Sequence, residues 1–129
     1  MADAPTSIAI AVVERDNHFL VGERPAGKPL AGYSEFPGGR VEASESPEEA
    51  AIRECEEETG LKVEIVGSYG DCLHDYSHDR VHLYFLSCRA VAGEMLPKPP
   101  FEWIPRNELA ELRFPEANAT LLARLLHGA

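Results

Sequence analysis

The stretch GGRVEASESPEEAAIRECEEETGL constrains the fold more tightly than any other part of this chain. Ser46 can cap a helix, and Pro47 suits the first helical position. Glu49 completes a capping box with Ser46, and Gly60 fits the position just beyond the last helical residue. We therefore predict a helix over residues 47–59. Its buried stripe is expected to consist of Ala51, Ile52, Cys55 and Thr59.

The acidic residues of this predicted helix gather on one face near its C-terminal end. Glu54, Glu57 and Glu58 stand at i, i+3 and i+4, so their carboxylates are neighbours. Each like-charge pair at this spacing costs about 0.2–0.5 kcal/mol, and an acid in the last turn opposes the helix dipole by roughly 0.3–1 kcal/mol. An exogenous cation would offset both costs, and three carboxylates suit Mg²⁺ or Mn²⁺. A solvated acidic face is the alternative, which spacing alone leaves open.

The rest of the chain predicts strands around this helix and a second helix near the C-terminus. SIAIAVVERD and HFLVGERP are typical of two strands joined across Asp16 and Asn17. KVEIVGSYGDCLHDY and DRVHLYFLSCRAV indicate an antiparallel pair joined around Ser77 and His78, and FEWIP indicates a short further strand. PEANATLLARLLHG carries apolar residues at helical spacing. Because strands and helices are interleaved, we expect a mixed α and β fold.

Length and charge narrow the possible functions. The 129 residues indicate one domain, residues 1–129, long enough to bury its own core. The net charge of -10 argues against long DNA or RNA as a partner, because binding to their phosphates needs clustered Lys and Arg. The sequence shows neither a membrane span nor a signal peptide, so we expect a cytoplasmic protein. Cys55, Cys72 and Cys88 predict neither a disulfide framework nor a zinc knuckle.

The fixed positions of the glutamate-rich stretch resemble a known motif. Gly39 is followed after five residues by Glu45, and after seven more by Arg53 and Glu54. A Glu-Glu pair and a glycine complete a pattern that resembles the Nudix box of the Nudix hydrolases at every fixed polar and glycine position. The one departure is Cys55, which stands where the family usually has an aliphatic residue and is a mild substitution there.

The resemblance implies an α/β fold of the Nudix type, an α/β/α sandwich with a mixed, largely antiparallel sheet between helices. It also implies Mg²⁺-dependent hydrolysis of a nucleoside diphosphate linked to another moiety, with Mn²⁺ able to substitute. The metal ligands carried over from the family are the backbone carbonyl of Gly38 and the carboxylates of Glu54, Glu57 and Glu58. Glu45 would support these ligands or contact a second metal, and Arg53 would orient them by salt bridges. Glu54 or Glu57 would be the general base.

The likeness extends beyond the box. SEFPGGRVE and FPEANATLLARL look like MutT-type nucleoside triphosphate pyrophosphohydrolases, the branch that removes oxidised dGTP and its relatives from the nucleotide pool. In that branch an asparagine, here Asn118, reads the purine edge, and an amide with a donor and an acceptor suits that task. Arg24 would flank the base or the phosphates, and Glu35 would lie beside the metal loop. Taken by itself, Asn118 shortly after Pro115 is typical of a helix cap or turn.

Several substrates stay open at this stage. The first class is a nucleoside triphosphate, either oxidised dGTP or another non-standard or pyrimidine one, cleaved to the monophosphate and pyrophosphate. The second class comprises nucleoside diphosphate sugars and dinucleoside polyphosphates. A non-catalytic nucleotide-binding module is expected to lose one of the three glutamates, and this chain keeps them all. In each case we expect a small nucleotide as the partner, no long nucleic acid, no membrane, and a monomer or homodimer.

One loop departs from the pattern of this branch. Its members often supply another glutamate from the loop before the final strand, where this chain reads GEMLPKPPFEW. Lys98 stands near the expected place, and Glu94 and Glu102 are the only acids nearby. The resemblance therefore does not extend to an additional metal ligand from this loop.

Two other patterns carry less weight. GERPAGKP nearly spells a phosphate-binding loop, but it ends in Pro29 and no helix pattern follows it. Residues of metal-ligand type also gather at His74, Asp75, His78, Asp79 and His82. A hairpin turn between two strands gives these side chains no common direction, so we expect solvated histidines rather than a zinc site.

Overall fold

The computed structural model of the protein describes residues 4–76, 79–91 and 96–127. Its strands are β1 (Thr6–Arg15), β2 (His18–Glu23), β3 (Ser34–Glu35), β4 (Gly38–Arg40), β5 (Val63–Asp75), β6 (Arg80–Ala90) and β7 (Glu102–Pro105). Its helices are α1 (Pro47–Thr59) and α2 (Ala119–His127), with two 3-10 helices, η1 (Arg106–Glu111) and η2 (Glu116–Asn118).

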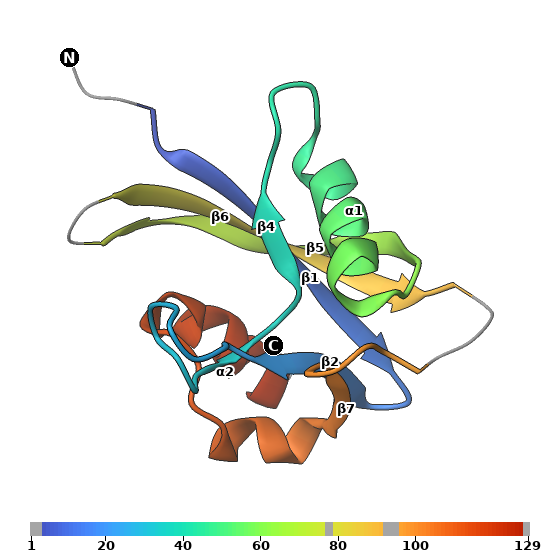
Figure 1. Cartoon of the computed structure of the whole chain (residues 1–129). Coiled ribbons are helices and arrows are strands. Elements are labelled where there is room, and N and C mark those ends of the chain that lie inside the picture. Colours follow the sequence, from blue (N-terminus) through green and yellow to red (C-terminus); the bar gives the residue numbers. More distant parts are fainter. Residues whose placement is uncertain (1–3, 77–78, 92–95, 128–129) are drawn as a thin grey trace.

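The strands form a mixed sheet in the order β3-β2-β1-β6-β5, to which β4 is added beside β1 and β7 beside β2 (Figure 1). β1 and β6 run parallel, with Ile8 opposite Leu83 and Val12 opposite Ser87. The remaining pairs are antiparallel. The expected mixed, largely antiparallel sheet is therefore confirmed.

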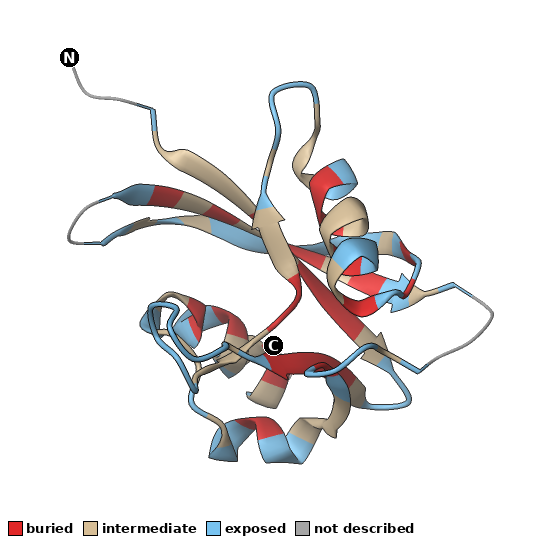
Figure 2. Cartoon of the chain, viewed as in Figure 1, coloured by how far each residue is buried: buried red, intermediate tan, exposed pale blue. Residues whose placement is uncertain are grey.

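The sheet buries both of its faces. On β1, Ala9 and Ala11 belong to the apolar cluster beneath α1, whereas Val12 belongs to the cluster beneath α2. This division follows from the strand itself, because successive side chains point to opposite faces. Figure 2 shows the buried residues concentrated on the sheet and on the sides of the helices that face it. The expected α/β/α sandwich is confirmed.

Helix α1 has the bounds and the caps that the sequence predicts. Ser46 Oγ accepts a hydrogen bond from the backbone N–H of Glu49, and Glu49 Oε1 accepts one from the backbone N–H of Ser46. Gly60 ends the helix in the left-handed conformation, at φ 81°. The buried residues are Ala50, Ala51, Cys55 and Thr59. Ile52 was predicted to be among them and is only half-buried. The helix instead contacts β1 through the small side chains of Ala50 and Ala51, which precede Ile52.

The β1–β2 connection differs in detail from the expectation, and the predicted β5–β6 turn is not described. The β1–β2 turn has positive φ at Asp16 and Asn17, as a tight hairpin requires, but the two strands pair only next to that turn. Residues 18–21 of β2 pair with β7, and its last two residues pair with β3. Ser77 and His78, the predicted β5–β6 turn, lie outside the described residues. The backbone of Tyr76 and Asp79, which flank them, is joined by hydrogen bonds.

The terminal helix begins later than its apolar pattern suggests. Residues 116–118 form η2, and α2 follows with Leu121 and Leu125 buried against the sheet. No helix follows GERPAGKP at the place where a phosphate-binding loop would need one, because the fully described residues 24–46 contain only turns, bends and short strands. No helix in the described parts of the chain is long and apolar enough to cross a membrane.

Candidate active site

The glycine turn at β4 brings backbone into contact with α1. Gly38 pairs with Ile10 and Gly39 with Ala9, so β4 lies directly on β1. The backbone N–H of Gly38 donates to Glu58 Oε1 at 2.9 Å. A Cβ on Gly39 would lie 2.2 Å from Glu54 Oε2, far closer than real contacts allow. At position 39, only glycine leaves room for the Glu54 carboxylate against this turn.

Arg53 ties the neighbouring acids together. Its Nε and one Nη donate to the two oxygens of Glu45 at 2.6 and 2.9 Å, which is a bidentate pair. The other Nη lies 3.2 Å from Glu57 and 3.5 Å from Glu54. Arg53 also donates to the carbonyl of Arg40 at 3.1 Å, which links α1 to β4. The guanidinium therefore holds three of the predicted site carboxylates in one network.

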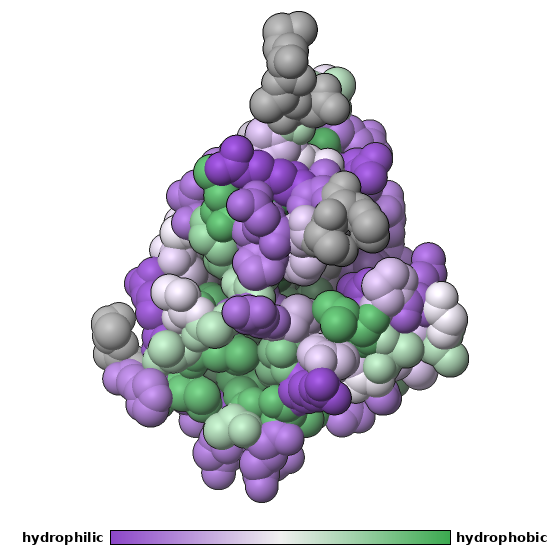
Figure 3. Space-filling view, turned by 90° about the vertical axis from the view of Figure 1, so that its left-hand side faces the viewer, coloured by the Kyte–Doolittle hydropathy of each residue, from purple (hydrophilic) through white to green (hydrophobic). Residues whose placement is uncertain are grey.

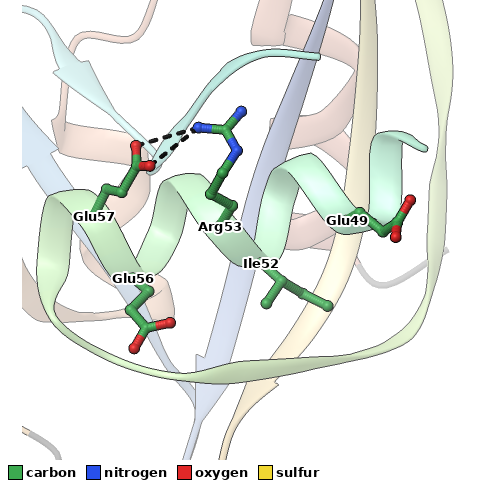
Figure 4. Close-up of a pocket in the computed structure, with 5 residues that line it drawn as sticks. All are labelled: Glu49, Ile52, Arg53, Glu56 and Glu57. Atoms are coloured by element: carbon green, nitrogen blue, oxygen red, sulfur yellow. Dashed lines mark hydrogen bonds and ion pairs between the residues drawn. The ribbon is translucent and has the colours of Figure 1, made fainter. Parts of the chain in front are cut away.

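Figure 4 shows the outer face of α1, where Arg53 and Glu57 point toward one another beside a shallow pocket. Glu49, Ile52 and Glu56 complete the lining of this pocket. The side chain of Glu57 is 57% exposed, compared with 18% for Glu54. Glu57 is thus a solvent-facing carboxylate that can swing away from Arg53, whereas Glu54 is enclosed.

The carboxylates differ in how costly their charge is. Burial, together with the charges of neighbouring acids, raises the pKa of Glu58 to about 7, although its hydrogen bond from Gly38 acts in the opposite direction. Burial likewise raises the pKa of Glu54. By contrast, hydrogen bonds from Arg53 and from the backbone of Glu42 lower the pKa of Glu45 to about 2. Glu54 and Glu58 therefore lack a sufficient positive partner, whereas Glu45 already has one.

These residues fit a hard divalent cation by their chemistry. Glu54, Glu57 and Glu58 offer oxygen ligands only, and Glu54 and Glu58 are enclosed acids whose charge a cation would stabilise. Within residues 4–76, 79–91 and 96–127, no three acidic, histidine or cysteine side chains already converge on one point. The Glu57 carboxylate does not converge with those of Glu54 and Glu58, since it faces Arg53.

A cavity of about 470 Å³ adjoins the glycine turn, and Gly38 is part of its wall. Its lining is mostly apolar and includes residues of β1 and β6, and Figure 3 shows the apolar hollow on this face of the molecule. Arg24, Glu35 and Asn118, the residues predicted to bind the substrate, all line it. The tertiary structure thus brings Asn118 together with Arg24 and Glu35, which lie in a distant part of the sequence.

The polar residues of this cavity are held in different ways. Arg24 donates to the carbonyl of Pro29 at 2.7 Å and to Glu35 at 3.1 Å, so its guanidinium organises the loop and the acid. Burial raises the pKa of Glu35, and the charge of Arg24 acts against that shift. Asn118 is only 7% exposed, and its amide has no hydrogen-bond partner among the described residues. Its donor and acceptor are therefore available to a ligand.

Among the cavity residues that sequence reasoning missed are Leu30 and Tyr76. Leu30 reaches the cavity from the loop after β2 and has a positive φ of 60°, and Tyr76 reaches it from the end of β5. Both are large apolar side chains that remain partly exposed. No local pattern marks either position, because each depends on the fold around the cavity. The unusual backbone of Leu30 is visible only in the structure.

The described histidines of this pattern do not converge on one point with other metal-binding side chains. His82 is bonded to Asp71 and stacks on the ring of Tyr84, with 4.2 Å between ring centroids. His74 instead meets the ring of Tyr76 edge-on. His78 lies outside the described residues. Among those that are described, the arrangement gives no support to a zinc site.

Comparison with known proteins gives the family. The NUDIX domain family matches residues 4–125. The chain is 35% identical to an 8-oxo-dGTP diphosphatase of Haemophilus influenzae, covering 93% of this chain and 90% of that protein. It is 30% identical to the 8-oxo-dGTP diphosphatase of Escherichia coli, covering 92% and 94%.

Other similarities are shorter or concern the fold alone. A CTP pyrophosphohydrolase of Escherichia coli is 44% identical over 62 residues, 48% of this chain and 45% of that protein. The crystal structure of a MutT protein from Methanosarcina mazei superposes with a TM-score of 0.80 at 21% identity, covering 99% of this chain and 98% of that one. The chain therefore belongs to the NUDIX domain family and is a MutT-like Nudix hydrolase.

Proposed function

We propose that this protein hydrolyses a nucleoside triphosphate to the monophosphate and pyrophosphate, with Mg²⁺ as the working metal. The observation that carries the proposal is the position of Gly38. It lines the 470 Å³ cavity, and its N–H binds Glu58 of the glutamate helix. A nucleotide whose base occupies the cavity would therefore extend its phosphates over the glycine turn toward the acids. The anionic protein meets an anionic substrate through a cation.

The metal would be held by the carboxylates of Glu54, Glu57 and Glu58 and by the backbone carbonyl of Gly38. When bound, it would neutralise charge on the phosphates and lower the pKa of an attacking water. Glu45 would act from behind these ligands, because both of its oxygens are already engaged by Arg53 and the backbone of Glu42. Arg53 would fix the orientation of the acids around it. Mn²⁺ has the same preference for oxygen ligands and would substitute.

The general base is assigned to one of two acids, Glu54 and Glu57. Both stand on the face of α1 that carries the metal ligands, and a carboxylate cannot coordinate and accept a proton through the same lone pair. Glu54→Gln and Glu57→Gln separate the two roles when Mn²⁺ binding and turnover are measured on each variant. The base is the acid whose loss stops turnover while Mn²⁺ still binds.

Nucleotide recognition would fall to the polar groups of the cavity. The free amide of Asn118 would pair with a base edge, which offers both a donor and an acceptor. Glu35 would accept a hydrogen bond from a ring N–H, and Arg24 would hold Glu35 and the loop in place. Oxidised dGTP is the first candidate substrate, because the relatives that match along nearly the whole chain are 8-oxo-dGTP diphosphatases. The shorter match to a CTP pyrophosphohydrolase keeps a pyrimidine triphosphate as the second candidate.

The test is a panel of nucleotides with Mg²⁺, read by the phosphate products. We expect pyrophosphate and a monophosphate from 8-oxo-dGTP or CTP, and loss of turnover in Glu57→Gln with an unchanged melting curve. Inactivity on every triphosphate, with cleavage of a nucleoside diphosphate sugar or a dinucleoside polyphosphate, would transfer the function to that class. Nucleotide binding without any cleavage would leave a binding module. As a nucleotide-pool enzyme, the protein would act as a single domain in the cytoplasm.

A further inference from the structure

The C-terminal end of α1 is an unfavourable place for its own side chains. Its last turn carries Glu56, Glu57 and Glu58 and no basic residue. The last carbonyls of a helix have no partner within the helix, and the negative end of the dipole disfavours acids. This turn also carries two of the predicted metal ligands. Its geometry therefore depends on donors from outside the helix.

Lys98 supplies those donors from the segment that precedes β7, which passes the end of α1 (Figure 1). Its Nζ donates to the carbonyl of Glu57 at 3.1 Å, and its backbone N–H donates to the carbonyl of Thr59 at 2.9 Å. Gly60 donates to the carbonyl of Glu56 at 2.9 Å. Of these three carbonyls at the helix end, two are thus bound by one residue that lies about forty positions away, beyond the reach of any local cap.

Lys98 is itself fixed to the body of the protein. Its carbonyl accepts a hydrogen bond at 3.0 Å from the backbone N–H of Phe101, which is buried in the cluster beneath α1. The Phe101 ring packs so closely under Gly22 that a Cβ there would lie 2.8 Å from it. The methylene stem of Lys98 lies over Gly60, at an ordinary contact distance of 3.5 Å from a Cβ placed there. Lys98 therefore connects the helix end to the core.

We propose that Lys98 is a positioning residue for the metal-binding turn of α1. The inference deepens the proposed function and rests on its metal site. Gly38 holds the turn from one side through Glu58, and Lys98 holds it from the end through the Glu57 carbonyl. Without the ammonium group, the Glu57 carbonyl is hydrogen-bonded only to water and the last turn frays. The Glu57 and Glu58 carboxylates then adopt a wider range of orientations. A metal ion then has to order them as it binds.

The size of the effect is bounded by the interaction that is lost. Removing a group that supports metal ligands weakens metal affinity by about 10–100-fold when it contacts the ligand side chain directly. Lys98 acts through the backbone and is exposed, so we expect a loss of about threefold to tenfold, as for one net hydrogen bond. Global stability should change little, because the same contact is a surface contact.

The experiment compares Lys98→Met, Lys98→Arg and Lys62→Met. Lys62→Met is the matched control, because Lys62 is an exposed lysine just beyond the same helix end and its side chain has no partner among the described residues. Mn²⁺ binding is measured without nucleotide by electron paramagnetic resonance, and melting curves verify folding. Lys98→Met should raise the dissociation constant about threefold to tenfold, whereas the other two variants should stay within about twofold of the wild type.

The outcomes separate the two proposals. Unchanged or tighter Mn²⁺ binding by Lys98→Met overturns the positioning role, and so does an equal loss in Lys62→Met, which would indicate charge alone. An equal loss in Lys98→Arg overturns it as well, because arginine keeps the donor and the charge. If the wild type binds Mn²⁺ but cleaves no triphosphate, only the proposed function fails. If it binds no Mn²⁺, both fail.

Discussion

Replacing either glycine of the β4 turn by alanine should be harmful, but one substitution should lower activity and the other should lower stability. In Gly39→Ala, the new Cβ would lie 2.2 Å from Glu54 Oε2 and 2.4 Å from Glu54 Cδ. These atoms form the end of a flexible side chain, so the carboxylate yields and the backbone stays. Restoring an ordinary contact of 3.4 Å moves that oxygen by roughly 1 Å, and a misplacement of about 1 Å in a catalytic group can cost about 100-fold in rate.

Gly38→Ala meets backbone instead. Its Cβ would lie 2.4 Å from the carbonyl oxygen of Ala9 and 3.0 Å from Cα of Ile10, both in β1 at the centre of the sheet. Neither atom can rotate away, so β4 must separate from β1. Overpacking of this kind costs about 1–3 kcal/mol. For a domain of this size each kcal/mol lowers the melting temperature by about 4 °C, which predicts a fall of about 4–12 °C.

The assay pairs a melting curve with Mg²⁺-dependent turnover on the best nucleotide of the panel. Gly39→Ala should melt within about 4 °C of the wild type and lose about 100-fold in kcat. Gly38→Ala should show the large thermal shift. The reasoning is refuted if Gly39→Ala keeps full activity, because Glu54 would then not be needed where the structure places it. It is equally refuted if the two variants lose the same stability.

Three further predictions follow from the site and the core. Because burial raises the pKa of Glu58 to about 7, a metal ion must displace a proton from this carboxyl group below that pH. The Mg²⁺ concentration for half-maximal activity should therefore rise about tenfold per pH unit below pH 7 and level off above it. A profile that does not change with pH would contradict this prediction. Asn118→Ala should raise KM for the preferred nucleotide about twofold to tenfold with kcat nearly unchanged, as steady-state kinetics would show, whereas a fall in kcat alone would remove Asn118 from base binding. Burial raises the pKa of the Cys55 and Cys88 thiols to about 11 and about 12, so iodoacetamide at pH 8 should label only Cys72 in the folded protein, and mass spectrometry of native Cys55 or Cys88 adducts would show otherwise.

The sequence predicts best where the determinants are local. The capping box at Ser46 and Glu49 and the left-handed Gly60 define α1 to the residue, because each acts within one turn of the helix. The spacing of Glu54, Glu57 and Glu58 places them on one face for the same reason. Ile52 was predicted to be buried and is only half-buried. Periodicity indicates the direction in which a side chain points, but not how closely the sheet approaches it.

The cavity could not be predicted in this way. Arg24, Glu35 and Asn118 were proposed one by one from a resemblance, and nothing in the sequence shows that they share one wall with Leu30 and Tyr76. Their meeting depends on β2 leaving β1 after a short pairing and on the parallel pairing of β1 with β6. Both are long-range contacts, which the short-range periodicity of a sequence does not encode.

The role of Lys98 could not be predicted from the sequence either. From the sequence it was only a residue where a further acid was expected, in a loop rich in proline. In the structure its side chain binds the carbonyl of Glu57, and its segment is tied to the core by Phe101. The sequence by itself determined the glutamate helix, its caps and the family, since these follow from residues within a few turns of one another. Only the tertiary structure decided what encloses the nucleotide and what steadies the metal-binding turn, because those contacts join segments that the chain brings together only on folding.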